Sequence, residues 1–397
     1  MNKTVKGSMR SVLCLILSLV LTTQLLSIPA KAVGETIDNK GILVEAKSAL
    51  LMEPSSGKII YEKNSHEKFA PASVTKIMTM LLAMEAIDSG KIKLEDKITI
   101  SENSKKMGGS SMILDTGEVR TVEEILKGIA IASGNDAAVA MAEYLGGSES
   151  AFVDMMNEKV KLLNMKDTSF RNSTGLSAEG HLTSAYDISI MSRELLKHPK
   201  ILKYSGTYME TIAEGRKTPI GLVNHNKLVR FFNGCDGLKT GFTDEAKYCI
   251  SATAVRNNVR MLAIIMGAPT YKIRNSDASM LMNFGFSKFE TKKIISKDEK
   301  LEKIPLNKKG DKFLIPKAQE DFSLTLERGK KNEIIKKIVI EEGLKEYKKD
   351  VAIGFCEIYV DNELCGKVVI YSDRDIKKSR VWENIKNNIT DLFNRAI

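Results

Sequence analysis

Three short stretches of this chain carry residue types that can perform acyl transfer through a serine ester. They are Ser-Val-Thr-Lys at 73–76, Ser-Gly-Asn at 133–135 and Lys-Thr-Gly at 239–241. The first contains a hydroxyl nucleophile, Ser73, and an amine, Lys76, that can deprotonate it. The second adds another hydroxyl and an amide, and the third adds a cation that could hold a carboxylate. Together they supply the groups that acyl transfer through a covalent intermediate requires.

The spacing of Ser73 and Lys76 brings the hydroxyl and the amine together if both residues lie at the start of a helix. Residues three apart share one face of a helix, and the N–H groups of its first turn can stabilise an oxyanion near Ser73. The run at 77–84 is apolar on all sides, which predicts a fully buried helix. Burial and a second cation, such as Lys239, would lower the pKa of Lys76 and make it a base near neutral pH.

The same spacings occur elsewhere in the chain, so no single motif identifies a site. Ser-x-x-Lys is repeated at 55–58 and 65–68, and Ser-x-Asn at 101–103, in polar or charged sequence where the side chains would be solvated. Ser133 could instead cap the helix that follows it, and Lys239 could be a solvated lysine on an edge strand. The occurrence of all three motifs in order within one candidate domain favours a common site.

The sequence around the motifs predicts one mixed sheet flanked by helices, an α/β fold. Apolar runs on either side of Pro-Ser-Ser-Gly at 54–57 predict a hairpin. Helices are expected at 122–132, 137–145, 150–163, 185–196 and 277–284, and strands at 237–240, 248–255 and 259–266.

The beginning of the chain has the pattern of a secretory signal peptide. A basic start, an apolar run at 12–26 and Ala-Lys-Ala at 30–32 predict cleavage after Ala32. An uncleaved membrane anchor is the alternative, but the apolar run is short and is interrupted by Thr-Thr-Gln at 22–24. We therefore expect residues 1–32 to be removed on export.

The remaining chain is too long for one compact core, which predicts two domains. We place an α/β catalytic domain at 33–286 and a small all-β domain at 287–372. Short alternating runs and a turn at Asp361-Asn362 predict a hairpin within the second domain.

The last segment, 373–397, has the pattern of an amphipathic helix. Its apolar side chains recur mostly every three or four residues, and basic side chains lie between them. This pattern is typical of a helix that lies on a membrane surface. The alternatives are a helix that packs on the β domain and a helix that binds a partner protein.

The composition and the spacing of histidines and cysteines argue against some classes of partner and cofactor. The 397 residues carry a formal net charge of +10 but no dense basic cluster with interleaved aromatic residues, so we expect no nucleic acid partner. The histidines are scattered and the cysteine spacing fits no zinc pattern, so we expect no metal and no cofactor. Outside the leader, Cys235, Cys249, Cys356 and Cys365 are expected to be free thiols, although Cys356 and Cys365 could form a bridge across the hairpin.

The chain resembles the serine penicillin-recognising enzymes, and specifically the low-molecular-mass penicillin-binding proteins that act as D-alanyl-D-alanine carboxypeptidases. The resemblance covers roughly the entire chain after the leader. It rests on the three motifs and on the segments at 51–58, 71–73, 117–118, 133–138, 172–176 and 236–243. It implies a penicillin-binding/β-lactamase-like catalytic domain, a small all-β domain and a terminal membrane-surface helix.

The resemblance also implies a role for each motif residue in catalysis. Ser73 would be the acylated nucleophile and Lys76 its general base. Ser133 would relay the proton, and Asn135 would orient the substrate amide.

The third motif would bind the substrate. Lys239 and Thr240 would hold the terminal carboxylate, and Gly241 would let the substrate approach closely. The backbone N–H groups of Ser73 and Phe242 would form the oxyanion hole. Some relatives place an arginine in an Asn-x-Asn segment before this motif, where the chain has His225. Arg230 is one candidate to replace that positive charge.

The function implied by the resemblance is removal of the terminal D-alanine from peptidoglycan stem pentapeptides, with β-lactams as acylating inhibitors. The enzyme would act outside the cytoplasm, at the cell membrane or wall. A serine β-lactamase is one alternative, but no Glu-x-x-Leu-Asn setting for a deacylating glutamate occurs between the second and third motifs. A catalytically inactive penicillin-binding module is another, although all the reacting groups are present.

Overall fold

The structure is a computed structural model, and it describes residues 41–213, 216–306, 313–341 and 346–377. The predicted signal peptide at 1–32 and residues 378–397 of the predicted terminal helix lie outside the described residues. The residues at the start of that predicted helix include a short strand, β19 (Ile376–Lys377), so a helix would have to begin after it. Within the described ranges, no helix combines the length and the apolar character needed to cross a bilayer.

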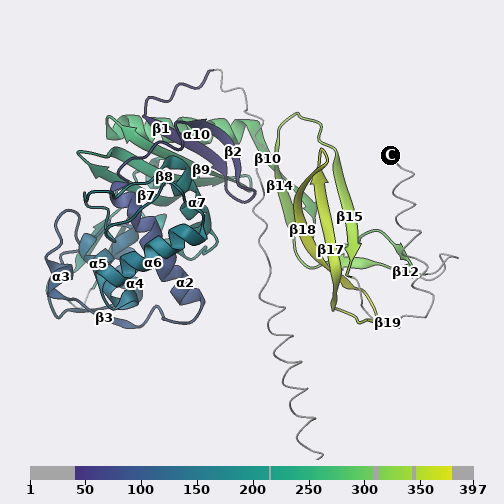
Figure 1. Ribbon diagram of the computed structural model, residues 1–397, viewed down its shortest axis with the longest axis horizontal. Helices are drawn as coiled ribbons and strands as arrows, with labels where there is room; N and C mark the ends of the chain where they lie inside the picture. Colours follow the sequence, from purple (N-terminus) through teal and green to yellow (C-terminus); the bar gives the residue numbers. More distant parts are fainter. Residues whose placement is uncertain (1–40, 214–215, 307–312, 342–345, 378–397) are drawn as a thin grey trace, which may run out of the picture. The chain divides into compact units, whose positions relative to one another are not determined.

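A five-stranded sheet with the order β2-β1-β9-β8-β7 forms the centre of the α/β part of the chain (Figure 1). Its strands are β1 (Ser48–Glu53), β2 (Lys58–Lys63), β7 (Cys235–Thr243), β8 (Lys247–Arg256) and β9 (Val259–Ala268). The expectation of a mixed sheet was wrong, because all four strand pairs are antiparallel. Short turns join β1 to β2, β7 to β8 and β8 to β9, and such turns connect antiparallel neighbours.

The sheet is buried on both faces, and alternate residues of each strand enter different cores. Leu50 and Met52 of β1 belong to the core shared with the helical block, whereas Ala49 and Leu51 belong to the core under helix α10 (Tyr271–Lys288). This alternation follows from the two-residue period of a strand. Figure 1 shows α10 along one face of the sheet and the helical block on the other.

The helical block lies between β2 and β7 in the sequence. Its helices are η1 (Ala72–Thr75), α2 (Lys76–Asp88), α3 (Glu102–Lys105), α4 (Val122–Ala130), α5 (Asn135–Gly146), α6 (Glu149–Leu162), α7 (Ala185–Leu196), α8 (Ile201–Ser205) and α9 (Leu228–Phe231). Two small antiparallel pairs accompany them, β3 (Lys97–Thr99) with β4 (Val119–Thr121) and β5 (Met209–Ile212) with β6 (Ile220–Val223). As predicted from its apolar sequence, α2 is buried almost all round.

The remaining described residues form the β domain, which follows α10. Its four-stranded sheet has the order β13 (Pro316–Ala318), β18 (Glu363–Ser372), β17 (Ala352–Val360) and β15 (Ile334–Ile340). The other strands pair as β10 (Phe289–Ile295) with β14 (Phe322–Glu327), β11 (Ile304–Pro305) with β12 (Phe313–Leu314), and β16 (Glu346–Tyr347) with β19. The predicted hairpin is confirmed as β17 and β18, joined through Asp361 and Asn362, which both have positive φ as a type I′ turn requires.

Truncation of Phe152 on α6 tests the packing of the helical block. Phe152 is fully buried, so we expect Phe152→Ala to lower the free energy of unfolding by about 3–5 kcal/mol through lost burial and a residual cavity. Urea unfolding of the mature protein measures this change. The matched control is Leu162→Ala at the end of the same helix, where the side chain is 78% exposed and the loss should stay within about 0.5 kcal/mol. Equal losses in the two variants would contradict this packing.

Candidate active site

Ser73 lies in η1, the single 3-10 turn that leads into the buried helix α2. Its neighbours Val74 and Lys76 are fully buried, whereas Ser73 itself keeps part of its surface exposed. Strand β7 approaches this turn closely, because a Cβ atom at Gly241 would lie only 3.0 Å from the backbone nitrogen of Ser73. The first and third motifs therefore meet at the backbone of Ser73.

The amine of Lys76 joins three segments of the chain. Nζ lies 3.0 Å from Ser73 Oγ, 2.6 Å from Asn135 Oδ1 and 2.7 Å from the carbonyl oxygen of Thr174. The amide oxygen of Asn135 and the carbonyl of Thr174 can only accept hydrogen bonds, so they take two N–H groups of the amine. The third partner, the Ser73 hydroxyl, can donate to the lone pair when the amine is neutral.

The surroundings of Lys76 favour the neutral amine. Complete burial and the positive charge of Lys239 lower the pKa of Lys76 well below its usual value, and Asp136 opposes them only in part. The amine is thus a base poised one hydrogen bond from the Ser73 hydroxyl.

The second motif lies at the start of helix α5. Ser133 is buried and has a positive φ of 60°, and Asn135 is the first residue of the helix. The residue in the N-cap position is Gly134, with no side-chain cap, so the alternative that Ser133 caps this helix is wrong. Asn135 also donates from Nδ2 to the carbonyl of Gly108 at 2.6 Å, which fixes its amide between that loop and Lys76.

Asp136 is a residue of the candidate site that the sequence did not single out. Its buried carboxylate accepts hydrogen bonds from the backbone N–H groups of Met112 and Leu114 and from the hydroxyl of Ser111. It thereby holds the loop before α4 against the start of α5, and it is a negative charge that acts on Lys76. Its position directly after the Ser-Gly-Asn motif was the available signal.

The third motif contributes a buried cation on the edge strand β7. Lys239 is buried, which rules out the alternative of a solvated edge lysine. Burial and the charge of Arg274 lower the pKa of Lys239 to about 7. Thr240, the next residue of the motif, is also buried.

Arg274 on α10 is a second positive charge beside the motif that sequence reasoning missed. Its guanidinium is almost fully buried and donates to Asn275 Oδ1. Burial lowers its pKa to about 10, so it stays cationic at neutral pH. Nothing in the periodicity of α10 distinguishes this arginine from a surface residue, because its site depends on how the helix packs against the sheet.

His225 is held near this group by two asparagines. Asn224 donates from Nδ2 to the carbonyls of Ser205 and Thr207, and Asn226 donates to the carbonyl of Gly237 on β7. This clamp fixes the backbone on both sides of His225 beside β7.

The imidazole of His225 is partly buried near several cations, although the residue as a whole is exposed. Partial burial and nearby cations lower its pKa to about 4, and these cations are Lys239, Lys227, Lys76 and Arg274. His225 is therefore neutral at physiological pH and can offer a hydrogen bond but no full charge. Arg230, the substitute considered from the sequence, lies over the rings of Tyr208 and Phe231.

A turn at 172–176 supports Ser73 from the other side. Asn172 Oδ1 accepts hydrogen bonds from the backbone N–H groups of Thr174 and Gly175, which directs the Thr174 carbonyl to Lys76. A Cβ at Gly175 would lie 1.8 Å from the carbonyl oxygen of Ala72, so only glycine fits against η1 here.

His181 is a further supporting residue that the sequence did not single out. Its Nδ1 accepts from the N–H of Arg171 at 3.0 Å, so the ring proton is on Nε2, which donates to Thr75 Oγ1 at 2.8 Å. Burial and the charge of Arg171 lower the pKa of His181 to about 4, which keeps the ring neutral. It ties the middle of the first motif to the loop that follows the 172–176 turn.

The other copies of the motifs have structural roles. The hydroxyls of Ser55 and Ser65 donate to Glu53 and Glu62, and Ser101 caps helix α3. The structure therefore separates them from Ser73 and Asn135, as their polar sequence surroundings indicated.

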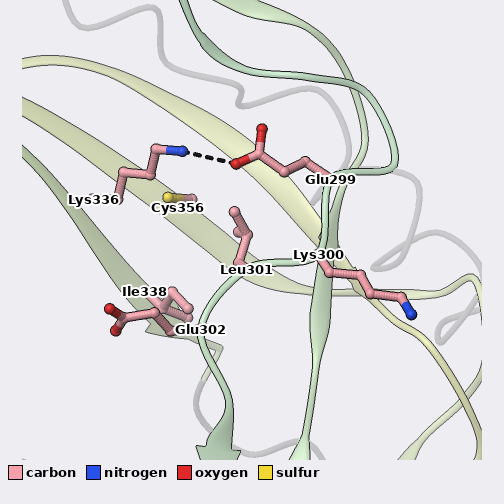
Figure 2. Close-up of a pocket in the computed structure, with 7 residues that line it drawn as sticks. All are labelled: Glu299, Lys300, Leu301, Glu302, Lys336, Ile338 and Cys356. Atoms are coloured by element: carbon pink, nitrogen blue, oxygen red, sulfur yellow. Dashed lines mark hydrogen bonds and ion pairs between the residues drawn. The ribbon is translucent and has the colours of Figure 1, made fainter.

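A hollow in the β domain contains none of the reacting groups (Figure 2). Its volume is about 180 Å³, and an ion pair of 2.8 Å joins Lys336 and Glu299 beside it. Burial raises the pKa of the Cys356 thiol to about 11, so this cysteine is protonated and poorly nucleophilic. The four cysteines of the described ranges are free, including Cys356 and Cys365, and these ranges hold no cluster of acidic, histidine and cysteine side chains suited to a metal ion.

Comparisons with known proteins match both parts of the chain. Residues 35–270 match the family model "D-alanyl-D-alanine carboxypeptidase", and residues 289–378 match "Penicillin-binding protein 5, C-terminal domain". The D-alanyl-D-alanine carboxypeptidase DacF of Bacillus subtilis is 44% identical over 349 residues, which cover 87% of this chain and 90% of the relative.

Solved structures show the same fold. Penicillin-binding protein 5 from Haemophilus influenzae is 28% identical with a TM-score of 0.68, over 85% of this chain and 98% of that one. Penicillin-binding protein D2 from Listeria monocytogenes, solved with bound ampicillin, is 30% identical with a TM-score of 0.56, over 62% of this chain and 99% of that one.

Removal of the Lys239 charge tests the electrostatic control of Lys76. Because this charge lowers the pKa of Lys76, Lys239→Gln should raise that pKa and move the acid limb of the pH–rate profile to higher pH. The measurement is the rate of Ser73 acylation by a fluorescent penicillin as a function of pH. A changed pKa of Lys76 moves the midpoint of the acid limb, whereas weaker binding lowers the rate without moving that midpoint. Lys247→Gln, an exposed lysine at the start of β8, is the matched control and should leave the limb in place. An unchanged limb in Lys239→Gln would contradict the coupling.

Proposed function

Because this chain belongs to the D-alanyl-D-alanine carboxypeptidase family and is an enzyme of that activity, we propose roles for its individual residues. The catalytic residues are Ser73, Lys76 and Ser133, and the substrate-binding residues are Asn135, Lys239, Thr240, Gly241 and Phe242. The observation that carries this assignment is the triple contact of the Lys76 amine with Ser73, Asn135 and the Thr174 carbonyl. The substrate is the stem pentapeptide of peptidoglycan, and β-lactams acylate the same serine.

In the acylation step, neutral Lys76 takes the proton of the Ser73 hydroxyl as Oγ attacks the carbonyl carbon of the penultimate D-alanine. The backbone N–H groups of Ser73 and Phe242 stabilise the oxyanion of the tetrahedral intermediate. The C–N bond then breaks, and the proton passes from Lys76 through the Ser133 hydroxyl to the departing amine of the terminal D-alanine. An ester on Ser73 remains.

In the deacylation step, water attacks this ester while Lys76, again neutral, accepts its proton. The Ser73 oxygen leaves and recovers a proton from Lys76, which releases the shortened peptide. A β-lactam forms the same ester, but its amine stays attached to the acyl group after ring opening. It therefore does not leave the site as D-alanine does.

The terminal carboxylate binds where the positive charges gather. Lys239 and Thr240 hold it directly, and buried Arg274 adds a positive potential behind them. With a pKa of about 7 before substrate binds, Lys239 is poised to gain its full charge when a carboxylate arrives beside it. His225 can donate a hydrogen bond to the same group from the clamp of Asn224 and Asn226.

Release of D-alanine from a muramyl pentapeptide tests the catalytic assignment. Ser73→Ala should lower release by about a thousandfold or more and abolish labelling by fluorescent penicillin, because the ester can no longer form. Ser65→Ala is the matched control, since Ser65 begins another Ser-x-x-Lys copy but donates to Glu62. No release by the unaltered protein, or equal release by Ser73→Ala, would contradict the proposal.

Penicillin also distinguishes the two other functions considered from the sequence. A carboxypeptidase should hold the penicilloyl group on Ser73 for longer than a β-lactamase, which hydrolyses it rapidly. Stable labelling without any cleavage of the pentapeptide would indicate an inactive penicillin-binding module instead.

We propose that the mature enzyme acts at the outer face of the cell membrane. The leader at 1–32 would direct export, and the C-terminal segment at 373–397 would bind the membrane surface through its apolar and basic side chains. We keep the domain limits at 33–286 and 287–372. The first of these boundaries falls in the last turn of α10, which ends at Lys288.

Truncation after Lys377 tests the membrane role. We expect the full mature chain to sediment with anionic liposomes and the truncated chain to remain in the supernatant, because the truncation removes the apolar face and its flanking charges. Release of D-alanine from a soluble pentapeptide should be unchanged, which serves as the control for folding. Equal sedimentation of the two chains would overturn the membrane proposal without affecting the catalytic one.

A further inference from the structure

Strand β7 contains one residue more than its partner strand just before the Lys-Thr-Gly motif. Cys235 of β7 pairs with Ala254 of β8. The next pair joins Gly237 to Thr253, so β7 advances two residues where β8 advances one. Asp236 is the extra residue of this β-bulge. Bulges are common beside active sites, where they change the direction of the side chains around them.

The bulge decides which face of the sheet receives Lys239. Lys239 pairs with Ser251, whose hydroxyl forms a hydrogen bond with Ser192 on α7 of the helical block. Because paired residues project from the same face of a sheet, Lys239 faces the helical block, where the candidate site lies. A shift of one residue would pair Lys239 with Ile250 or Ala252, which both belong to the core under α10. Such a shift reverses the face of every side chain along a strand.

Arg260 on β9 holds the extra residue in place. Its guanidinium donates two hydrogen bonds of 2.8 Å, one to each carboxylate oxygen of Asp236. It also donates to Thr253 Oγ1 at 2.8 Å, so one side chain joins β9, β8 and the bulge of β7. The side chains of Arg260 and Asp236 are only 24% and 29% exposed. A bidentate pair of this kind fixes geometry as well as supplying energy.

The main chain of the bulge is held separately. Ser205 donates a hydrogen bond of 3.0 Å to the carbonyl of Asp236, and Asn226 donates one of 3.0 Å to the carbonyl of Gly237. A Cβ atom at Gly237 would lie 2.5 Å from the hydroxyl oxygen of Ser205, so the bulge fits closely against α8. These contacts fix the carbonyl groups, and Arg260 fixes the side chain that projects from the bulge.

We propose that Arg260 and Asp236 are positioning residues for the Lys-Thr-Gly motif. Their ion pair fixes the bulge, and the bulge directs Lys239 and Thr240 toward the terminal carboxylate of the substrate. This inference rests on the proposed function, in which the motif holds that carboxylate. Loss of the ion pair would let the bulge shift along β8. The motif would then bind the carboxylate less well, although every reacting group would still be present.

The test compares two pentapeptides that differ only at the terminal carboxylate. One ends in D-alanine and the other in D-alaninamide, and kcat/KM is measured for release of the terminal residue from each. The unaltered enzyme should prefer the free acid. Arg260→Gln should reduce the ratio of the two kcat/KM values about fivefold or more, because a misplaced motif loses contacts that only the acid makes. Most of this reduction should appear in KM for the acid, since the reacting residues are unchanged.

Asp236→Asn tests the ion pair from its other side. It should reduce the ratio in the same direction, and it replaces the carboxylate by a group of the same shape, so it keeps the test decisive if Arg260→Gln does not fold. The double variant should reduce the ratio no further than the larger single effect, because the two residues act as one unit. Losses that multiply in the double variant would contradict the proposal.

Controls separate a misplaced motif from a damaged enzyme. The ratio cancels any loss common to both peptides, and cooperative urea unfolding shows that each variant is folded. Arg328→Gln removes an ion pair with Glu290 in the β domain and should leave the ratio unchanged.

The possible failures are distinguishable. An unchanged ratio in both Arg260→Gln and Asp236→Asn would overturn this inference and leave the proposed function intact. No preference for the acid in the unaltered enzyme would overturn the carboxylate role of the Lys-Thr-Gly motif, and this inference with it. Failure of the unaltered enzyme to release the terminal residue from either peptide would overturn the proposed function as a whole.

Discussion

The burial of the Lys76 amine is the constraint on which the rest of the site depends. A buried amine must find partners for its hydrogen bonds, because an unpaired polar group in an apolar interior is costly. Lys76 finds them on η1, on α5 and on the 172–176 turn, three segments that the helical block brings together. The same burial lowers the pKa of the amine and makes it a base. One side chain thus couples the folding of the helical block to the chemistry of Ser73.

Several positive charges lie close together in the candidate site. Lys239 and Arg274 are both buried. The charge of Arg274 lowers the pKa of Lys239, and the charge of Lys239 lowers the pKa of Lys76. Like charges held together in a low dielectric oppose folding, and such strain is typical of functional sites. Under the proposed function, a substrate carboxylate would relieve this repulsion on binding, so part of its affinity would come from the arrangement of these charges. His225, neutral in this field, adds a hydrogen bond without adding to the repulsion.

Local sequence predicted the elements better than the interactions between them. The hairpin of β17 and β18, the buried helix α2 and the choice of Ser73 over the other copies followed from apolar patterning and turn residues, which act within a few positions. The antiparallel order of the central sheet could not be derived in this way, since β1 pairs with β9 far along the chain. Arg274 and His181 were missed for the same reason. Their importance comes from groups far along the chain and not from their own neighbours in sequence. The charge of Arg274 acts on Lys239, and His181 forms a hydrogen bond with Thr75.

Two glycines define how Ser73 is presented. A Cβ at Gly241 would crowd Pro71, Ala72 and Ser73, and one at Gly175 would collide with the carbonyl of Ala72. The η1 turn is therefore enclosed by backbone from two directions, and its position is set by close packing of main chain and not by flexible side chains. In the proposed role of nucleophile, a serine fixed in this way needs little reorganisation when a substrate binds, which is the condition for stabilising a transition state by preorganised groups. The glycine of the Lys-Thr-Gly motif thus acts first on the protein's own fold, and the room that it leaves for a substrate follows from that packing.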